Sequence, residues 1–282
     1  MSAEFIRAIR DAGIPFDADI TADGALHRVH VDGDKAGSKN AWYVCFGSAG
    51  AFGCNKRAVS GKWRANSKRE PLTQQARAEM EAERKARAEA QERAYIDAAS
   101  RAERILQAAK REASQHPYCV RKGIRPHGVK ANEHGWLVIP SYSAMTGKLQ
   151  TVQLIDRHGN KKMLTGGRMK EGCFPFQDCP EFWQNALHRI GLAEGIATTS
   201  TLAESLPTVA MFAAFSAGNL GSVATALRAR YPAAEITIYG DNDASGTGQR
   251  YATAAATAVC GLIAIPPIPG HDWNDFLMRG AA

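Results

Sequence analysis

Residues 235–243 read Glu-Ile-Thr-Ile-Tyr-Gly-Asp-Asn-Asp, an apolar run that ends in two closely spaced aspartates. Their apolar part is typical of a short buried strand, and Asp241 and Asp243 follow directly where this strand ends. Because side chains alternate along an extended chain, the two carboxylates leave the backbone on the same side. The pattern predicts a strand with an acidic pair at its carboxyl end.

Short apolar strands and helices alternate on both sides of this stretch. Such alternation predicts an α/β fold with a mostly parallel sheet flanked by helices. The predicted elements are a strand at 189–194, a helix at 197–205, a strand at 208–212, a helix at 220–231, a helix near 248–260 and a strand at 262–265.

Two further acidic segments fall at the carboxyl ends of predicted strands. Glu194 closes the apolar run that starts at Ile190, and Asp272 and Asp275 follow the last strand and a proline-rich turn. Ligands of parallel α/β sheets bind beyond the carboxyl ends of the strands. Carboxylates gathered there repel one another unless a cation lies between them, and Mg²⁺ or Mn²⁺ is the ion that suits oxygen ligands.

The charge of the chain suits a polyanionic partner. The formal net charge is +7 and the pI is about 9.1, although solubility alone explains such a balance equally well. Near the N-terminus, aromatic and basic residues are interleaved, which suits single-stranded nucleic acid but also fits a β-rich core with a solvated basic rim. These residues are Trp42, Tyr43, Phe46, Phe52 and Trp63 among Lys35, Lys39, Lys56, Arg57, Lys62 and Arg64.

The six cysteines include no Cys-x-x-Cys pair. A loose zinc set can be drawn from His27, His30, Cys45 and Cys54, but its spacing disfavours zinc, and reduced thiols of a cytosolic protein are the preferred interpretation. No apolar run is long enough to span a membrane, and the first residues do not resemble a secretory signal. We therefore expect a cytoplasmic protein without a membrane partner.

Changes in composition and in hydrophobic pattern along the sequence predict four segments. Residues 1–68 are expected to form a small β-rich module, and residues 69–115, rich in Ala, Glu, Arg and Gln, a long charged linker helix. Residues 116–185 contain a predicted hairpin at 136–155 and basic residues, and residues 186–282 hold the alternating strands and helices.

At this point the sequence resembles the Toprim domain of bacterial and phage primases, topoisomerases and nucleases. The matching motifs are Leu192-Ala-Glu194-Gly195, Tyr239-Gly-Asp241-Asn-Asp243 and His271-Asp272-Trp-Asn274-Asp275. Two further segments, 116–124 and 137–168, resemble the basic part that precedes Toprim in DnaG-like primases. The resemblance covers roughly residues 116–280 and is closest to the primase-like proteins of phages and plasmids, in many of which the N-terminal module is a degenerate zinc domain.

The resemblance implies a nucleotidyltransferase that joins nucleotides into short RNA primers on single-stranded DNA. It implies that Asp241 and Asp243 bind Mg²⁺ and the incoming triphosphate, and that Glu194 binds metal or accepts the proton of the attacking 3′-hydroxyl. Asp272 would complete the shell of the ion, with Asn274 and Asp275 as supports. The residues expected to contact nucleotide or DNA phosphates are Arg121, Lys161, Lys162 and Arg168.

Two positions depart from the family pattern. Thr198 stands where primases usually place an acid four residues after the glutamate, and His271 replaces the usual lysine. The alternatives are therefore a Toprim nuclease and a non-catalytic module that binds single-stranded nucleic acid in a phage or plasmid replication system. No helicase segment is recognised in the sequence, so the helicase of a primase of this kind would be a separate chain.

Overall fold

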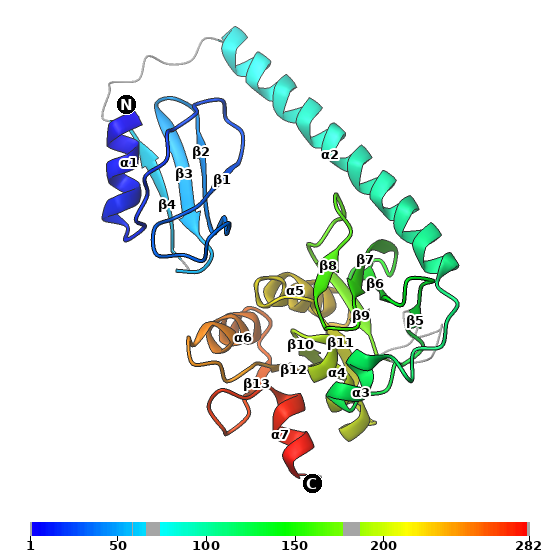
Figure 1. The fold of residues 1–282 in the computed structure, drawn as a ribbon. Helices are drawn as coiled ribbons and strands as arrows, with labels where there is room; N and C mark the ends of the chain where they lie inside the picture. Colours follow the sequence, from blue (N-terminus) through cyan, green and yellow to red (C-terminus); the bar gives the residue numbers. More distant parts are fainter. Residues whose placement is uncertain (1, 58, 66–73, 177–186, 281–282) are drawn as a thin grey trace. The chain divides into compact units, whose positions relative to one another are not determined.

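The structure is a computed structural model that describes residues 2–57, 59–65, 74–176 and 187–280 (Figure 1). By its contacts the chain divides into two compact units, Met1–Met80 and Glu81–Ala282. Each unit has a hydrophobic core of its own.

The first unit is a helix packed on one face of an antiparallel sheet. Helix α1 (Ser2–Asp11) buries Phe5 and Ile9 against Tyr43 and Phe52 of the sheet. Between its second and third strands the backbone amide of Phe46 donates to the carbonyl of Ala49 at 2.7 Å, which closes a tight turn. The strands, in spatial order, are β1 (His27–Val29), β2 (Ala41–Cys45), β3 (Ala49–Cys54) and β4 (Val59–Arg64).

Helix α2 (Gln74–Ala108) is long because good helix formers fill nearly all of its 35 positions. Residues 81–94 of the helix are exposed, and Ala98 and Ala102 in its later turns are buried. There Ala102 packs with Val138 and Val152 of the second unit. A long helix thus lies within the segment 69–115, for which one was predicted.

The second unit is built on one continuous mixed sheet of nine strands in the described part of the chain. Its parallel half follows the order β13-β12-β10-β11, and β9 joins it to the antiparallel half by pairing with both β11 and β6. The strands are β5 (Lys130–Ala131), β6 (Leu137–Ser143), β7 (Leu149–Ile155), β8 (Lys161–Met163), β9 (Gly172–Pro175), β10 (Arg189–Ala193), β11 (Ala210–Ala213), β12 (Glu235–Tyr239) and β13 (Leu262–Ala264).

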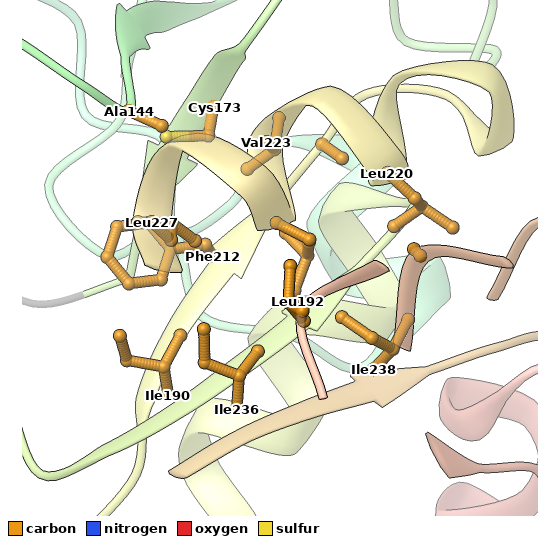
Figure 2. Packing of buried hydrophobic residues seen from close by; sticks show 14 of the residues in the cluster. Ala144, Cys173, Ile190, Leu192, Phe212, Leu220, Val223, Leu227, Ile236 and Ile238 are labelled. Carbon is orange, nitrogen blue, oxygen red and sulfur yellow. The ribbon is translucent and has the colours of Figure 1, made fainter. Parts of the chain in front are cut away.

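Helices cover both faces of this sheet because its central strands are apolar on both sides. On one face, Leu220, Val223 and Leu227 pack over Leu192 and neighbouring strand residues (Figure 2). The helices are α5 (Leu220–Arg230) and α6 (Thr247–Ala258) on this face, and α3 (Pro117–Lys122), α4 (Ile196–Ser205) and α7 (Trp273–Gly280) on the other, with a 3₁₀ turn, η2 (Ala217–Asn219), before α5.

The predicted α/β class with helices on the sheet is confirmed for the second unit, whereas the sheet is mixed rather than simply parallel. In the described part of the chain, the helices lack the combination of length and apolar character needed to cross a lipid bilayer.

Candidate metal and nucleotide site

The register of the parallel strands brings Glu194 and Asp241 to the same edge of the sheet. Ala193, the last residue of β10, lies opposite Tyr239, the last residue of β12. Glu194 follows the first strand directly, and Asp241 follows the second after Gly240. Their proximity in space therefore follows from strand pairing, although 46 residues of chain separate them.

A second set of contacts brings Asp272 to this edge. The amide of Asn242 donates to the carbonyl of His271 at 3.1 Å, and the amide of Gly270 donates to the carbonyl of Asn242 at 2.6 Å. The side chain of Asn242 also donates to the carbonyl of Pro266 at 2.9 Å. These bonds fasten the loop after β13 to the Asp241–Asp243 loop, so that the start of α7 lies beside the strand ends.

The result is a cleft of about 360 Å³ with acidic and basic side chains on its walls. The acids are Glu194, Asp241 and Asp272, and they come from three separate segments of the chain. The other lining residues are Tyr118, Arg121, Lys122, His158, Gly159, Lys161, Gly195, Ala197 and Thr198. A cleft that holds both charge signs suits a ligand made of a cation and a polyanion.

Asp241 has the most perturbed acid–base environment in the cleft. Burial, together with the negative charges of Glu194, Asp272 and Asp243, raises the pKa of its carboxyl from 3.8 to about 7, and Lys161 opposes this only in part. Its Oδ1 atom is buried and has no hydrogen-bond partner among the described residues. A cation bound beside this carboxyl group would therefore stabilise its ionised form.

Glu194 shares this environment. Burial raises the pKa of its carboxyl, and the charge of Asp243 adds to the effect, while the backbone amide of Ala217 and the charge of Lys161 act against it. A carboxyl with a raised pKa takes up and releases a proton nearer to neutral pH than an exposed glutamate does.

Asp243, predicted as a metal ligand, also accepts hydrogen bonds in the local structure. Its Oδ2 accepts the amide proton of Gly248 at 2.6 Å, and its Oδ1 accepts those of Ser245 and Thr247 at 2.9 and 3.2 Å. Burial acts to raise the pKa of this carboxyl, but these bonds and the Ser245 hydroxyl outweigh it, and the pKa is lowered. Asp243 holds the start of α6 and does not line the cleft, although its charge reaches Asp241.

The three polar residues at the start of α7 do three different things. Asp272 lines the cleft, and its Oδ1 accepts the amide proton of Asp275 at 2.8 Å, which caps the helix. Asn274 is only 2% exposed and donates to the Lys122 carbonyl and the Thr201 hydroxyl, both at 2.8 Å. Asp275 is exposed and pairs with Lys122 at 3.4 Å.

The four predicted phosphate-binding residues are divided by the fold. Arg121 and Lys161 line the cleft. Lys162, the neighbour of Lys161 on β8, lines a separate cavity of about 350 Å³ that also involves Trp136, as expected from the alternation of side chains along a strand.

Arg168 lies away from the cleft and contacts α2. Its guanidinium pairs with the carboxylate of Glu92 and lies 4.6 Å from the ring centroid of Tyr95. Arg101 of the same helix donates to the carbonyl of Thr165 at 2.7 Å. The loop at 164–168 is therefore engaged in docking α2.

Three cleft residues were not singled out by the sequence: Tyr118, Lys122 and His158. Burial raises the pKa of the Tyr118 hydroxyl to about 12, so the group stays protonated and can donate a hydrogen bond. Both Tyr118 and Lys122 belong to the 116–124 motif, which was the available signal. His158 lies in a turn between β7 and β8 that carried no recognisable motif.

The residues fit a hard divalent cation by their chemistry. Three carboxylates line one cleft, and a buried carboxylate oxygen of Asp241 lacks a partner among the described residues. They are not drawn into a coordination shell, since nowhere in the described ranges do three or more acidic, histidine or cysteine side chains converge as ligands.

The four residues of the loose zinc set have separate environments. His27 stacks on Tyr43 and bonds to Asp23, and His30 bonds to the carbonyl of Ser38. Cys45 and Cys54 are buried in the core of the first unit.

Comparison with known proteins supports the resemblance noted in the sequence. Residues 189–282 match the family model of the Toprim domain. Two proteins of Escherichia coli, both named DNA primase TraC, are 35% identical over 280 residues and 33% identical over 287 residues. Each alignment covers 93% of this chain but only 26% and 19% of the relatives, so the chain spans about a quarter and a fifth of their lengths.

Among solved structures, the primase fragment of the bacteriophage T7 primase-helicase protein is similar, with a TM-score of 0.42 and 19% identity over 57% of this chain and 65% of that chain. A similarity of this size carries no conclusion about function. Residues 189–282 therefore match the Toprim family, and the chain is similar to the TraC DNA primases over that part of their length, in line with the resemblance of its motifs.

Proposed function

We propose that this chain is a Mg²⁺-dependent nucleotidyltransferase that synthesises short RNA primers on single-stranded DNA. The observation that carries the proposal is the single cleft in which Glu194, Asp241 and Asp272 meet Arg121 and Lys161. Acids to hold a divalent ion and bases to hold a triphosphate are the two requirements of phosphoryl transfer. The names of the TraC relatives point to the same activity.

In this proposal Asp241 and Asp272 hold the divalent ion, and Asp243 keeps the Asp241 loop in place through its bonds to the start of α6. The bound ion would supply neutralisation of the charge on the phosphoryl oxygens and on the departing pyrophosphate. Glu194, with its raised pKa, is suited to accept the proton of the attacking 3′-hydroxyl.

Arg121 and Lys161 orient the triphosphate from the basic wall. Arg121 is fixed by a bond from its guanidinium to the carbonyl of Arg157 at 3.2 Å and lies 6.0 Å from the ring centroid of Tyr118. Desolvation in the cleft is the largest effect on Lys161 and lowers its pKa. The negative charges of Glu194, Asp272 and Asp241 act in the opposite direction and favour the protonated amine. The proposed partners are a single-stranded DNA template, nucleoside triphosphates and a replicative helicase.

The test is primer synthesis by the full chain on random single-stranded templates with labelled ribonucleoside triphosphates and Mg²⁺. Asp241→Ala should reduce nucleotide incorporation by at least about a hundredfold, because the substitution removes a proposed ligand of the divalent ion. The matched control is Glu133→Ala, which removes one acid whose side chain is 81% exposed in a turn of the same unit. Full activity of Asp241→Ala would refute the proposal.

A non-catalytic module is the second candidate, favoured by Thr198 in the cleft and by the acids not being gathered at ligand distance. It predicts metal-independent DNA binding without incorporation. Cleavage of the labelled template in Mg²⁺ without triphosphates would instead select a Toprim nuclease.

A further inference from the structure

The sheet of the first unit has one face that no element of residues 2–65 covers. Helix α1 packs on the other face, where Tyr43, Phe52 and Trp63 point. Because side chains alternate along a strand, the remaining strand positions face outward. We call this surface the open face; its residues are Arg28, Trp42, Val44, Ala49, Ala51, Gly53, Ser60, Lys62 and Arg64.

Strand pairing places small side chains along the centre of the open face. Trp42 lies opposite Gly53, and Val44 lies opposite Ala51, so the central strand β3 contributes only small side chains. On the far side of β3, Lys62 pairs with Ala51 and Arg64 with Ala49. The open face therefore carries aromatic and apolar side chains on β2 and basic side chains on β4.

Two aromatic rings on the β2 side rest over glycines. A Cβ atom at Gly53 would lie 2.8 Å from Trp42, and one at Gly24 would lie 2.6 Å from Phe46, so each ring lies directly against backbone. Phe46 is 58% exposed. The two residues are four positions apart along the chain, or about 13 Å in extended backbone, far enough for each ring to meet a different base.

The bases of the open face are exposed and lack carboxylate partners among the described residues. In the same unit, by contrast, Lys56 and Arg57 both pair with Asp34, at 2.8 and 3.1 Å. Arg28, Lys62 and Arg64 are the positive charges left available, and the outward strand positions of this face include no acid. Its charge is complementary to a polyanion.

We propose that the open face binds single-stranded nucleic acid, with bases stacked on Trp42 and Phe46 and the phosphates along Lys62 and Arg64. One partly exposed ring, Trp42, and one exposed ring, Phe46, beside basic side chains form the combination that single-strand-binding surfaces use, and a duplex does not present its base faces to such rings. The interaction requires neither a metal ion nor the cleft of the second unit. It would give the chain a binding site for the template outside the reaction site.

The experiment measures binding of the full chain to a fluorescein-labelled 20-nucleotide oligothymidine by anisotropy, in EDTA and without triphosphates. Trp42→Ala should weaken binding by about 5- to 100-fold, the effect of one stacked base, and Trp42→Phe should restore most of it. Lys62→Ala/Arg64→Ala should lower the slope of log K against log salt by about 1.4, which corresponds to two phosphates of a single strand.

The matched control is Lys35→Ala/Lys39→Ala, which removes the same charge from exposed positions in the loop before β2. It should leave the salt slope within about half a unit of the unsubstituted chain. The Asp241→Ala variant should bind as tightly as the unsubstituted chain, so loss of primer synthesis and loss of this binding are distinguishable.

Wild-type affinity in both Trp42→Ala and the Lys62/Arg64 variant would overturn the proposal. Equal affinity for a duplex of the same length would also overturn it, because stacking would then contribute nothing. If the variants lose primer synthesis while binding is unchanged, the open face docks on protein, and the proposal is again wrong.

Discussion

Asp241 combines burial with three neighbouring negative charges, and its pKa of about 7 has a consequence for stability. Because this pKa is raised above the unfolded value of 3.8, the folded chain keeps a proton that the unfolded chain has lost. The contribution of this proton to the free energy of unfolding is fully present below pH about 4, and it is lost as the pH rises to about 7. Above that pH, the ionised carboxylate is a cost to the metal-free protein.

Asp241→Asn should therefore stabilise the protein in EDTA at pH 8, by on the order of 1 to 2 kcal/mol after allowance for partial solvent screening. The gain should shrink towards pH 4.5. Urea unfolding at both pH values, with and without Mg²⁺, measures it. In Mg²⁺ the order should reverse, since the ion stabilises the ionised side chain. A variant that is less stable than the unsubstituted chain in EDTA at pH 8 would contradict this account.

Lys161 and Lys162 are adjacent, yet they line different cavities. We predict that Lys161→Ala raises the KM for triphosphate in primer synthesis about tenfold or more, because a phosphate contact in the cleft is lost. Lys162→Ala should change this KM less than twofold and serves as the charge-matched control. Equal effects of the two substitutions would show that the cleft does not distinguish these lysines.

At the scale of elements, helix α7 has a buried polar side chain, Asn274, and an exposed one, Asp275, next to each other. Asn274→Ala removes two hydrogen bonds from a side chain that is 2% exposed and leaves the carbonyl of Lys122 unpaired, so unfolding should become easier by about 1–3 kcal/mol. Asp275→Ala removes only an exposed ion pair and should cost less than about 1 kcal/mol. Chemical denaturation of both variants is the measurement, and a smaller effect for Asn274→Ala would contradict the assignment.

Helix α2 shows what its own sequence could and could not predict. Its composition, rich in helix-forming residues, predicted the helix. The partner of Arg168 was not predictable, because Glu92 and Tyr95 lie more than seventy residues away in the chain. Arg168, a basic residue after two glycines, was predicted to contact phosphate, whereas in the structure it contacts Glu92 and Tyr95.

At the scale of the whole second unit, the predicted boundary between residues 116–185 and 186–282 falls within a single sheet. β9 bonds to β6 on one side and to β11 on the other, so the two halves share one hydrogen-bonded layer. We predict one unfolding transition for both halves. Single-tryptophan variants that keep Trp136 or Trp273 should report coincident urea midpoints, whereas two separate midpoints would show independent halves.

The sequence by itself determined the alternation of strands and helices, the placement of Glu194 and the Asp241–Asp243 pair at strand ends, and the Toprim resemblance. These are local properties, since periodicity and turn residues act over a few positions. Only the tertiary structure decided that Asp243 is tied to α6, that Lys162 and Arg168 lie outside the cleft, and that Tyr118, Lys122 and His158 lie inside it. Those outcomes depend on strand register and on packing between distant segments, and local patterns do not encode which partner a side chain will meet.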